Sequence, residues 1–211
     1  MSLTEGPVRD RLFALWLPMI GGILMVKAVG LADAYFVGQL GEEALAAISF
    51  TFPVVMTLIS LAIGLSAGAS SVLSRAIGNS ADPAEQQGIV TAAVFIAIAI
   101  SILLGAVGYF GIGYVLALMG ASGNILADAT AYMQIWFVGA VFLILPIAIN
   151  GLLRSTGDGV SPALLMSGIA VLNIGLNPVF IYGLGPAPDL GMQGAAVATV
   201  SARAVSTVIA L

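Results

Sequence analysis

Six long apolar stretches, separated by short turn-rich segments, constrain this chain more than any other feature; they cover residues 12–37, 44–70, 88–115, 127–152, 162–184 and 192–211. About 20 apolar residues are enough for an α-helix to cross a bilayer core of roughly 30 Å. Lipid offers no partner to backbone polar groups, so only helices or a closed barrel span it, and long unbroken apolar runs favour helices. We therefore predict an all-α membrane protein with six transmembrane helices and a short tail over residues 1–11.

The composition agrees with a chain that lies in lipid. Hydrophobic residues make up 60% of it and charged residues 8%, whereas an ordinary globular domain has roughly 25% charged residues. The chain has no Cys and no His, so thiolate metal sites and the commonest general base are absent. We expect a protein that is not an enzyme, needs no cofactor, has the lipid bilayer as a partner and binds no nucleic acid.

Small residues and prolines within the stretches indicate how the helices pack. The segment GLSAG at residues 64–68 matches the G-x-S-x-G nucleophile elbow in letters only, because no strand or base accompanies it. We interpret its small residues, four positions apart, as a surface for close helix packing. A proline leaves a carbonyl unbonded and permits a bend. Prolines in or at the start of the stretches are Pro18, Pro53, Pro146, Pro162 and Pro178.

The distribution of charge predicts the orientation in the membrane. Four basic residues fall on one side, namely Arg9, Arg11, Arg75 and Arg154. The loops on the other side carry Glu42, Glu43, Asp128 and Asp189 and no basic residue. Tyr35, Tyr114, Tyr132 and Tyr182 fall near that second side, where amphipathic rings are favoured. Positive charge favours the cytoplasm, so we expect a cytoplasmic N-terminus.

Three ionisable residues lie inside the predicted spans: Lys27, Asp33 and Arg203. Each costs about 2.5 to 3.5 kcal/mol near a helix centre, so such residues usually face a partner or a cavity. Lys27 and Asp33 are six positions apart, about 9 Å along the axis and about 240° around it. The structural alternatives are snorkelling for Lys27 and helix capping for Asp33.

Neutral polar groups accompany these charges. Asn173 and Asn177 are four apart and share a helix face, and Thr199 lies in the last stretch, one turn before Arg203. A carboxylate with amide and hydroxyl oxygens is a set that a hard cation or a proton site would use. The alternative is a set of interhelical hydrogen bonds that only joins helices. A coupling role requires Asp33 to lie within about 10 Å of one of these asparagines, roughly twice the gap between neighbouring helix side chains.

Several ordered motifs resemble those of multidrug and toxic compound extrusion (MATE) transporters. PMIGG leads to ADAYFVGQLGEEALAA, and SRAIGN, RSTGD, LN-x-x-LNPVFIYG and LGMQGAAVAT follow in the family's order. Together they cover nearly all of the chain. The resemblance implies the N-terminal six-helix lobe of a two-lobed, twelve-helix transporter. It also implies export of organic cations or amphipathic drugs in exchange for protons or sodium, from a bacterial or archaeal plasma membrane.

The resemblance also implies roles for individual residues. Asp33 corresponds to the first-span carboxylate that takes the coupling ion. Asn173, Asn177 and Thr199 occupy positions that build its site, a candidate Na⁺ site, in the DinF-like branch. Pro18 matches the proline about which the first span bends. Apart from the resemblance, the intramembrane cations Lys27 and Arg203 are candidates for tuning Asp33.

One departure bears on the coupling ion, since Asn177 stands where many relatives have a second Asp. A single carboxylate favours protons over sodium as the coupling ion. Two other functions stay open at this point: a lipid-linked sugar flippase of the same superfamily, and a membrane assembly partner that transports nothing. As a transporter, the chain would need a C-terminal lobe or a second copy of itself as a partner.

Overall fold

The computed structural model describes residues 8–185 and 188–210, and within them the chain is all helical. The helices in order are α1 (Val8–Gly38), α2 (Glu42–Gly78), α3 (Pro83–Leu118), α4 (Gly123–Val138), α5 (Ala140–Ser155), α6 (Val160–Ile181) and α7 (Met192–Ala210). The predicted fold class, an all-α membrane bundle, is therefore confirmed. The predicted tail is shorter than expected, because residues 8–11 already belong to α1.

The bend in the bundle falls at a glycine. The predicted stretch 127–152 is divided into α4 and α5, which meet at Gly139 with a bend of 53°. A Cβ at Gly139 would collide with Val200 of α7, so the glycine allows α7 to approach the bend. Pro53, Pro146 and Pro178 lie inside α2, α5 and α6 without ending them. The glycine, and not a proline, thus marks the break.

In the described part of the chain, four helices are each long and apolar enough to cross a membrane: residues Met19–Gly38 of α1, and the whole of α2, α3 and α6. The bent pair α4 and α5 counts as a fifth span if it crosses as one unit. α7 has a different character, because buried polar side chains interrupt its apolar sequence, namely Thr199, Ser206 and Thr207.

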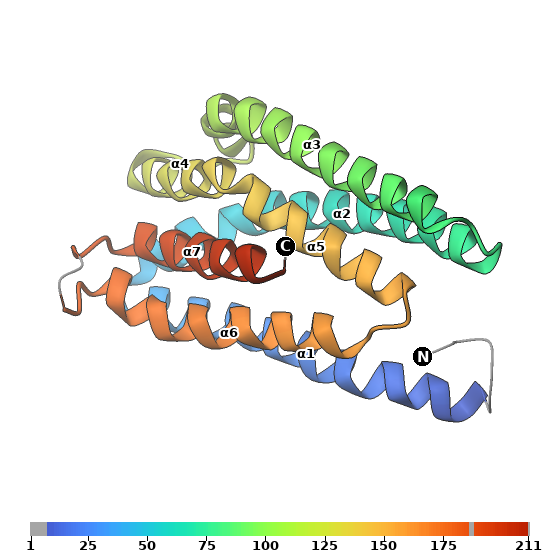
Figure 1. Ribbon diagram of the computed structural model, residues 1–211. Helices are drawn as coiled ribbons and strands as arrows, with labels where there is room; N and C mark the ends of the chain where they lie inside the picture. Colours follow the sequence, from blue (N-terminus) through green and yellow to red (C-terminus); the bar gives the residue numbers. More distant parts are fainter. Residues whose placement is uncertain (1–7, 186–187, 211) are drawn as a thin grey trace.

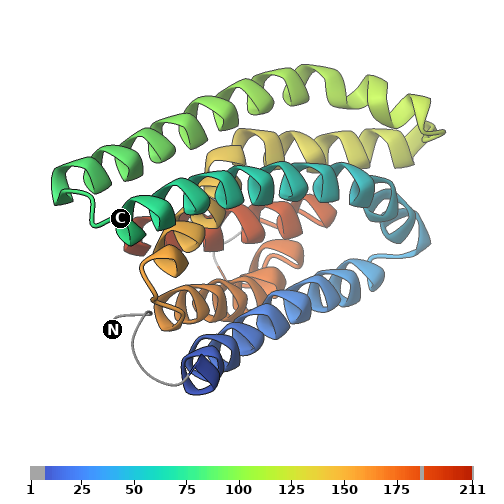
Figure 2. The ribbon, with the colours of Figure 1, turned by 90° about the vertical axis from the view of Figure 1, so that its right-hand side faces the viewer.

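α7 lies in the middle of the bundle. It sits between the α1 and α6 pair on one side and helices α2 to α5 on the other, as both views show (Figures 1 and 2). It contacts α4, α5 and α6, and its small residues make this close packing feasible. Ala195, Ala196, Ala198 and Ala202 are all fully buried. The polar residues of α7 are therefore held inside the protein.

Close packing of α2 uses a serine that lies between two glycines. Gly64 and Gly68 have no neighbouring atoms near their Cβ positions, so the predicted packing role of these glycines is wrong. Ser66 is buried against Gly151 of α5 and donates a 2.9 Å hydrogen bond to the carbonyl oxygen of Ile147. The segment packs through its serine, while its glycines face outward.

Candidate coupling site

A chain of hydrogen bonds joins three helices in the interior, and we call its members Asp33, Asn173, Asn177 and Thr199 the polar cluster. Asn177 Nδ2 donates to Asp33 Oδ1 at 2.7 Å, which links α6 to α1. Asn173 Nδ2 donates to Thr199 Oγ1 at 2.8 Å, which links α6 to α7. Asn177 Nδ2 also lies 3.3 Å from Asn173 Oδ1. The structure thus brings together all four residues that the sequence singled out.

The local sequence explains why these side chains meet. Asn173 and Asn177 share one face of α6 because they are four positions apart, and both are fully buried. Gly194 of α7 lies against the backbone of Phe180 and Ile181, where a Cβ would come within 2.7 Å of the Ile181 nitrogen. This close approach brings the start of α7, and with it Thr199, alongside α6. A glycine therefore positions one member of the polar cluster.

Asp33 is not a helix cap. α1 continues to Gly38, five residues beyond it, and only 9% of Asp33 is exposed. Its distance to Asn177 is well inside the limit of about 10 Å that a coupling role requires. A network that only joined helices would not need a buried carboxylate, whose desolvation is costly.

Lys27 and Arg203 lie in different surroundings. Lys27 is exposed on α1, and within the described residues neither its ammonium group nor any other cation forms an ion pair within 4 Å with Asp33. The guanidinium of Arg203 lies over the ring of Trp136, 5.9 Å from its centroid, and is near enough to Asp33 to interact with its charge. Of the two candidate tuning residues, the structure sets Arg203 beside Asp33 and leaves Lys27 on the outside.

Pro18 lies within α1, which runs as one helix from Val8 to Gly38. The side chain of Pro18 falls outside the described residues. The backbone there is continuous helix, so this structure holds the first span in an unbroken form.

The polar cluster has limited capacity for a metal ion. In the described part of the chain, no three residues of the types His, Cys, Asp and Glu lie close enough to hold one. The candidate Na⁺ ligands offer one carboxylate with amide and hydroxyl oxygens, and the amide hydrogens of Asn177 and Asn173 are already directed to Asp33 and Thr199. Asn177 Oδ1 is buried without a hydrogen-bond partner, so it is a free acceptor beside Asp33.

The contacts of three aromatic residues near the polar cluster, Tyr132, Trp136 and Tyr182, were not predicted from the sequence. Tyr132 is 3% exposed and packs against Trp136, with ring centroids 6.2 Å apart, so its predicted place at the external interface is wrong. Tyr182 Oη lies 3.0 Å from the carbonyl oxygen of Phe36 and 3.2 Å from Gln39 Oε1, and so ties the end of α6 to the end of α1. The spacing of four between Tyr132 and Trp136 was the available signal for a shared helix face.

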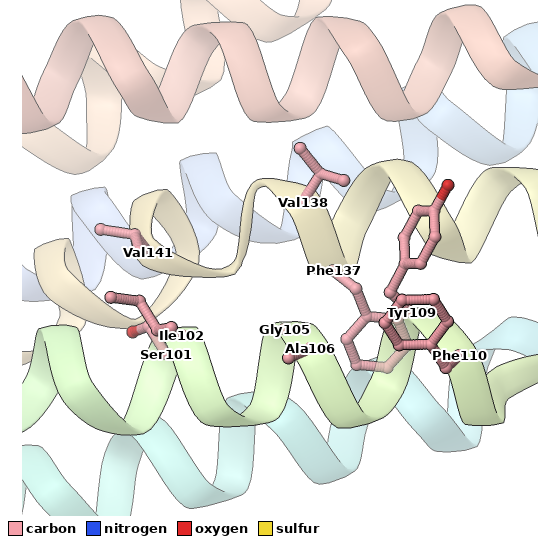
Figure 3. Close-up of a pocket in the computed structure, with 9 residues that line it drawn as sticks. All are labelled: Ser101, Ile102, Gly105, Ala106, Tyr109, Phe110, Phe137, Val138 and Val141. Atoms are coloured by element: carbon pink, nitrogen blue, oxygen red, sulfur yellow. The ribbon is translucent and has the colours of Figure 1, made fainter.

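A hollow lies away from the polar cluster, between α3 and the bend of α4 and α5 (Figure 3). Its volume is about 360 Å³, and its walls are mostly apolar side chains, including Ile102, Phe110, Val138 and Val141. The hydroxyl of Ser101 donates within its own helix to the carbonyl oxygen of Ala97 at 2.6 Å. We call this hollow the α3–α4 groove. It offers no charged group to an ion.

Comparison with known proteins agrees with the fold and the motifs. A family model described as MatE matches residues 18–179. The chain is similar to a FAD transporter of Shewanella oneidensis, with 42% identity over 94% of this chain and 44% of that protein. It is 32% identical to the probable multidrug resistance protein YoeA of Bacillus subtilis, over 87% of this chain and 38% of that protein. A solved MOP superfamily transporter from Pyrococcus furiosus matches with a TM-score of 0.91 and 32% identity, over 99% of this chain and 45% of its own. The chain spans less than half the length of these relatives, and it belongs to the MatE family.

Proposed function

We propose that this chain forms one half of an exporter of amphipathic organic compounds, driven by protons that bind to Asp33. The observation that supports this function best is the buried Asp33 carboxylate, bonded to Asn177 between α1 and α6. An ionisable group inside a membrane protein usually marks an ion pathway or a proton relay. The relatives described as transporters support the same class of function.

The polar cluster can respond to a change in the charge of Asp33. When Asp33 is ionised, its carboxylate accepts a hydrogen bond from Asn177 Nδ2. When it is protonated, its hydroxyl needs an acceptor, and Asn177 Oδ1 is buried without a partner. Rotation of the Asn177 amide would then exchange donor for acceptor and alter the contact with Asn173. We propose that this change biases α1 between an unbroken form and a form bent at Pro18.

Such a switch couples two ligands only if each binds the two forms unequally. The protonated state of Asp33 would favour one form of α1 and the substrate the other. Binding of the proton and binding of the substrate would then exclude one another, so that proton uptake is coupled to substrate release. Because Asn177 stands where many relatives have a second Asp, this site offers one carboxylate in place of two to hold a sodium ion, so we propose protons, and not Na⁺ at these residues, as the coupling ion.

Alternating access needs a second wall around the substrate site. We propose that the partner is a C-terminal lobe or a second copy of this chain, since the chain spans less than half the length of its relatives. We further propose that the protein lies in a bacterial or archaeal plasma membrane. Its N-terminus would be in the cytoplasm, because the Arg residues outside the spans fall on that side.

The substrate class has two candidates. The similarity to the probable multidrug resistance protein YoeA favours drugs, whereas the similarity to a FAD transporter favours an anionic dinucleotide. For the Pyrococcus furiosus relative, a reverse polarity of the binding pocket was taken to suggest a different function. The sign of the charged side chains inside the lobe therefore bears on whether the substrate is a cation or an anion. A flippase receives less support, because Lys27 lies on the outside of the described bundle.

The test is exchange across vesicles that contain the native protein to which this chain belongs. Uptake of ethidium, a cation, and of FAD, an anion, would be measured under a pH gradient at constant Na⁺ and under a Na⁺ gradient at constant pH. We expect the pH gradient to drive accumulation of one probe, and a protonophore to abolish it. Accumulation driven by Na⁺ alone would contradict proton coupling. No exchange of either probe would favour an assembly partner.

A further inference from the structure

We propose that Arg203 and Trp136 form a binding site for a phosphate group of the transported compound, so that the substrate is an anion. This inference rests on the proposed function, because it names the substrate class of the same lobe. We call the two residues the arginine–tryptophan pair.

The pair presents two hydrogen-bond donors without acceptors. Arg203 Nε and Trp136 Nε1 are both buried, and neither makes a hydrogen bond of good geometry within the described residues, although the Tyr132 hydroxyl lies near the indole nitrogen. They belong to adjacent side chains, since the guanidinium lies over the indole ring. Buried donors are normally satisfied, and leaving them unpaired costs free energy. Two neighbouring unpaired donors suit a ligand that brings acceptor oxygens.

The geometry of the guanidinium suits a phosphate in particular. Arg presents its N–H groups in a planar fork that matches two phosphate oxygens at once. The guanidinium carbon lies 5.9 Å from the centre of the Trp136 ring, within the range of a cation–π contact, which helps to hold the fork in place. Arg203 is partly exposed although its Nε is buried, so part of this side chain is open to a ligand.

The charges around the pair argue against a cationic substrate. From α1 it is faced by Asp33, and from α4 by Tyr132. From α6, the amide of Asn173 bonds to Thr199, one turn before Arg203 on α7. The carboxylate of Asp33 already accepts a hydrogen bond from Asn177. One buried guanidinium therefore balances the one buried carboxylate, and no excess of negative charge is left to attract an organic cation.

The test compares two ligands that share one ring system and differ in a single phosphate. Binding of FMN and of riboflavin to the native protein in nanodiscs would be measured by equilibrium dialysis. A charge-assisted hydrogen bond to phosphate predicts that FMN binds about 10- to 100-fold more tightly than riboflavin. Equal binding of the two ligands to the wild-type protein would overturn the proposal, whatever the variants do.

Variants locate the phosphate preference. Arg203→Gln should bring FMN binding down to the level of riboflavin and leave riboflavin binding unchanged. Arg203→Lys should retain part of the preference, because it keeps the charge and loses the fork. Trp136→Phe keeps an aromatic ring and removes the indole donor, so it should weaken FMN binding by a smaller factor. An unchanged FMN preference in Arg203→Gln would overturn the proposal.

Arg75→Gln is the matched control, because it removes an exposed positive charge at the far end of α2. It should leave the FMN preference intact.

If Arg203→Gln does not fold, a competition experiment on the wild-type protein replaces it. Displacement of bound FMN by inorganic phosphate would support a phosphate site, and no displacement would contradict it. Binding needs no gradient, so FMN binding without pH-driven exchange would contradict proton coupling and leave the phosphate site standing. Exchange of a cation without FMN binding would disprove the phosphate site alone.

Discussion

The buried polar cluster and the outward-facing α3–α4 groove are two regions of one bundle with opposite chemistry. The groove has a volume of about 360 Å³ and mostly apolar walls. The polar cluster is closed, buried and joined by hydrogen bonds between 2.7 and 3.3 Å long. The comparison teaches that the size of a hollow does not identify the functional region in a membrane bundle. An apolar hollow is compatible with lipid, whereas a buried carboxylate such as Asp33 has to be stabilised by hydrogen bonds.

The largest expected effect concerns the two glycines that shape these regions. A Cβ at Gly194 would collide with the backbone of α6, which cannot yield, whereas a Cβ at Gly108 would collide with the ring of Phe137, which can rotate. We expect Gly194→Ala to lower the free energy of unfolding by about 3 kcal/mol and Gly108→Ala by about 1 to 2 kcal/mol. Chemical unfolding in detergent measures both values.

Gly175→Ala and Gly111→Ala are the controls on α6 and α3, since neither glycine has an atom within 4 Å of a Cβ. Alanine has the better helix propensity, so both controls should be neutral or slightly stabilising. A loss as large in a control as in its partner would show that the close contacts do not explain the effect. A greater loss for Gly108→Ala than for Gly194→Ala would reverse the ranking of the two regions.

The next prediction compares the loss of unfolding free energy when one hydroxyl is removed from each region. Thr199→Val has nearly the same shape and leaves Asn173 Nδ2 buried without an acceptor. We expect it to cost about 1 to 3 kcal/mol of unfolding free energy. Ser101→Ala removes a hydroxyl that only bonds within its own helix, so we expect a change of about 0.5 kcal/mol or less. Equal costs in the two variants would contradict the difference between the regions.

A smaller effect than that of Thr199→Val is expected in a loop that belongs to neither region. Asp158 Oδ1 accepts hydrogen bonds of 3.0 Å from the N–H groups of Val160 and Ser161 at the start of α6. Hydrogen bonds from the Ser161 side chain and backbone, and from the Val160 backbone, hold the pKa of Asp158 below its ordinary value. Asp158→Ala should therefore destabilise the protein by about 0.5 to 1 kcal/mol at pH 7.

This contribution depends on pH in a defined direction. A carboxyl group whose pKa is lower in the folded state stabilises the protein above its unfolded pKa and loses that effect as the pH falls. The difference between the wild-type protein and Asp158→Ala should shrink below about pH 4. Thermal unfolding at pH 7 and at pH 3 would show it. A difference that grows on acidification would be inconsistent with capping by the ionised Asp158.

Periodicity and hydropathy predicted the helices and most of the polar cluster. The spacing of four between Asn173 and Asn177 sets them on one face whatever surrounds them, and the insertion cost of Asp33 marks it as an interior group. The family resemblance joined these residues to Thr199. These features could be predicted because helix geometry and lipid solvation act on each span separately.

Features that depend on contacts between spans could not be predicted. The break at Gly139 follows from the approach of Val200 on a distant helix, and no local proline indicated it. Lys27 and Arg203 were equivalent as intramembrane cations in the sequence, yet one is exposed and the other lies beside Trp136. Tyr132 was misplaced for the same reason, because only the packing of α4 decides which of its faces is buried.

The most direct test of the account is transport by Asp33→Asn in the native protein, measured in vesicles at pH 6 and pH 8. Asparagine keeps the size of the side chain and removes the proton-binding group. We predict that accumulation driven by a pH gradient is lost at both pH values, while exchange of substrate for substrate without a gradient continues. Accumulation at wild-type rates at both pH values would contradict the central claim that Asp33 carries the coupling proton.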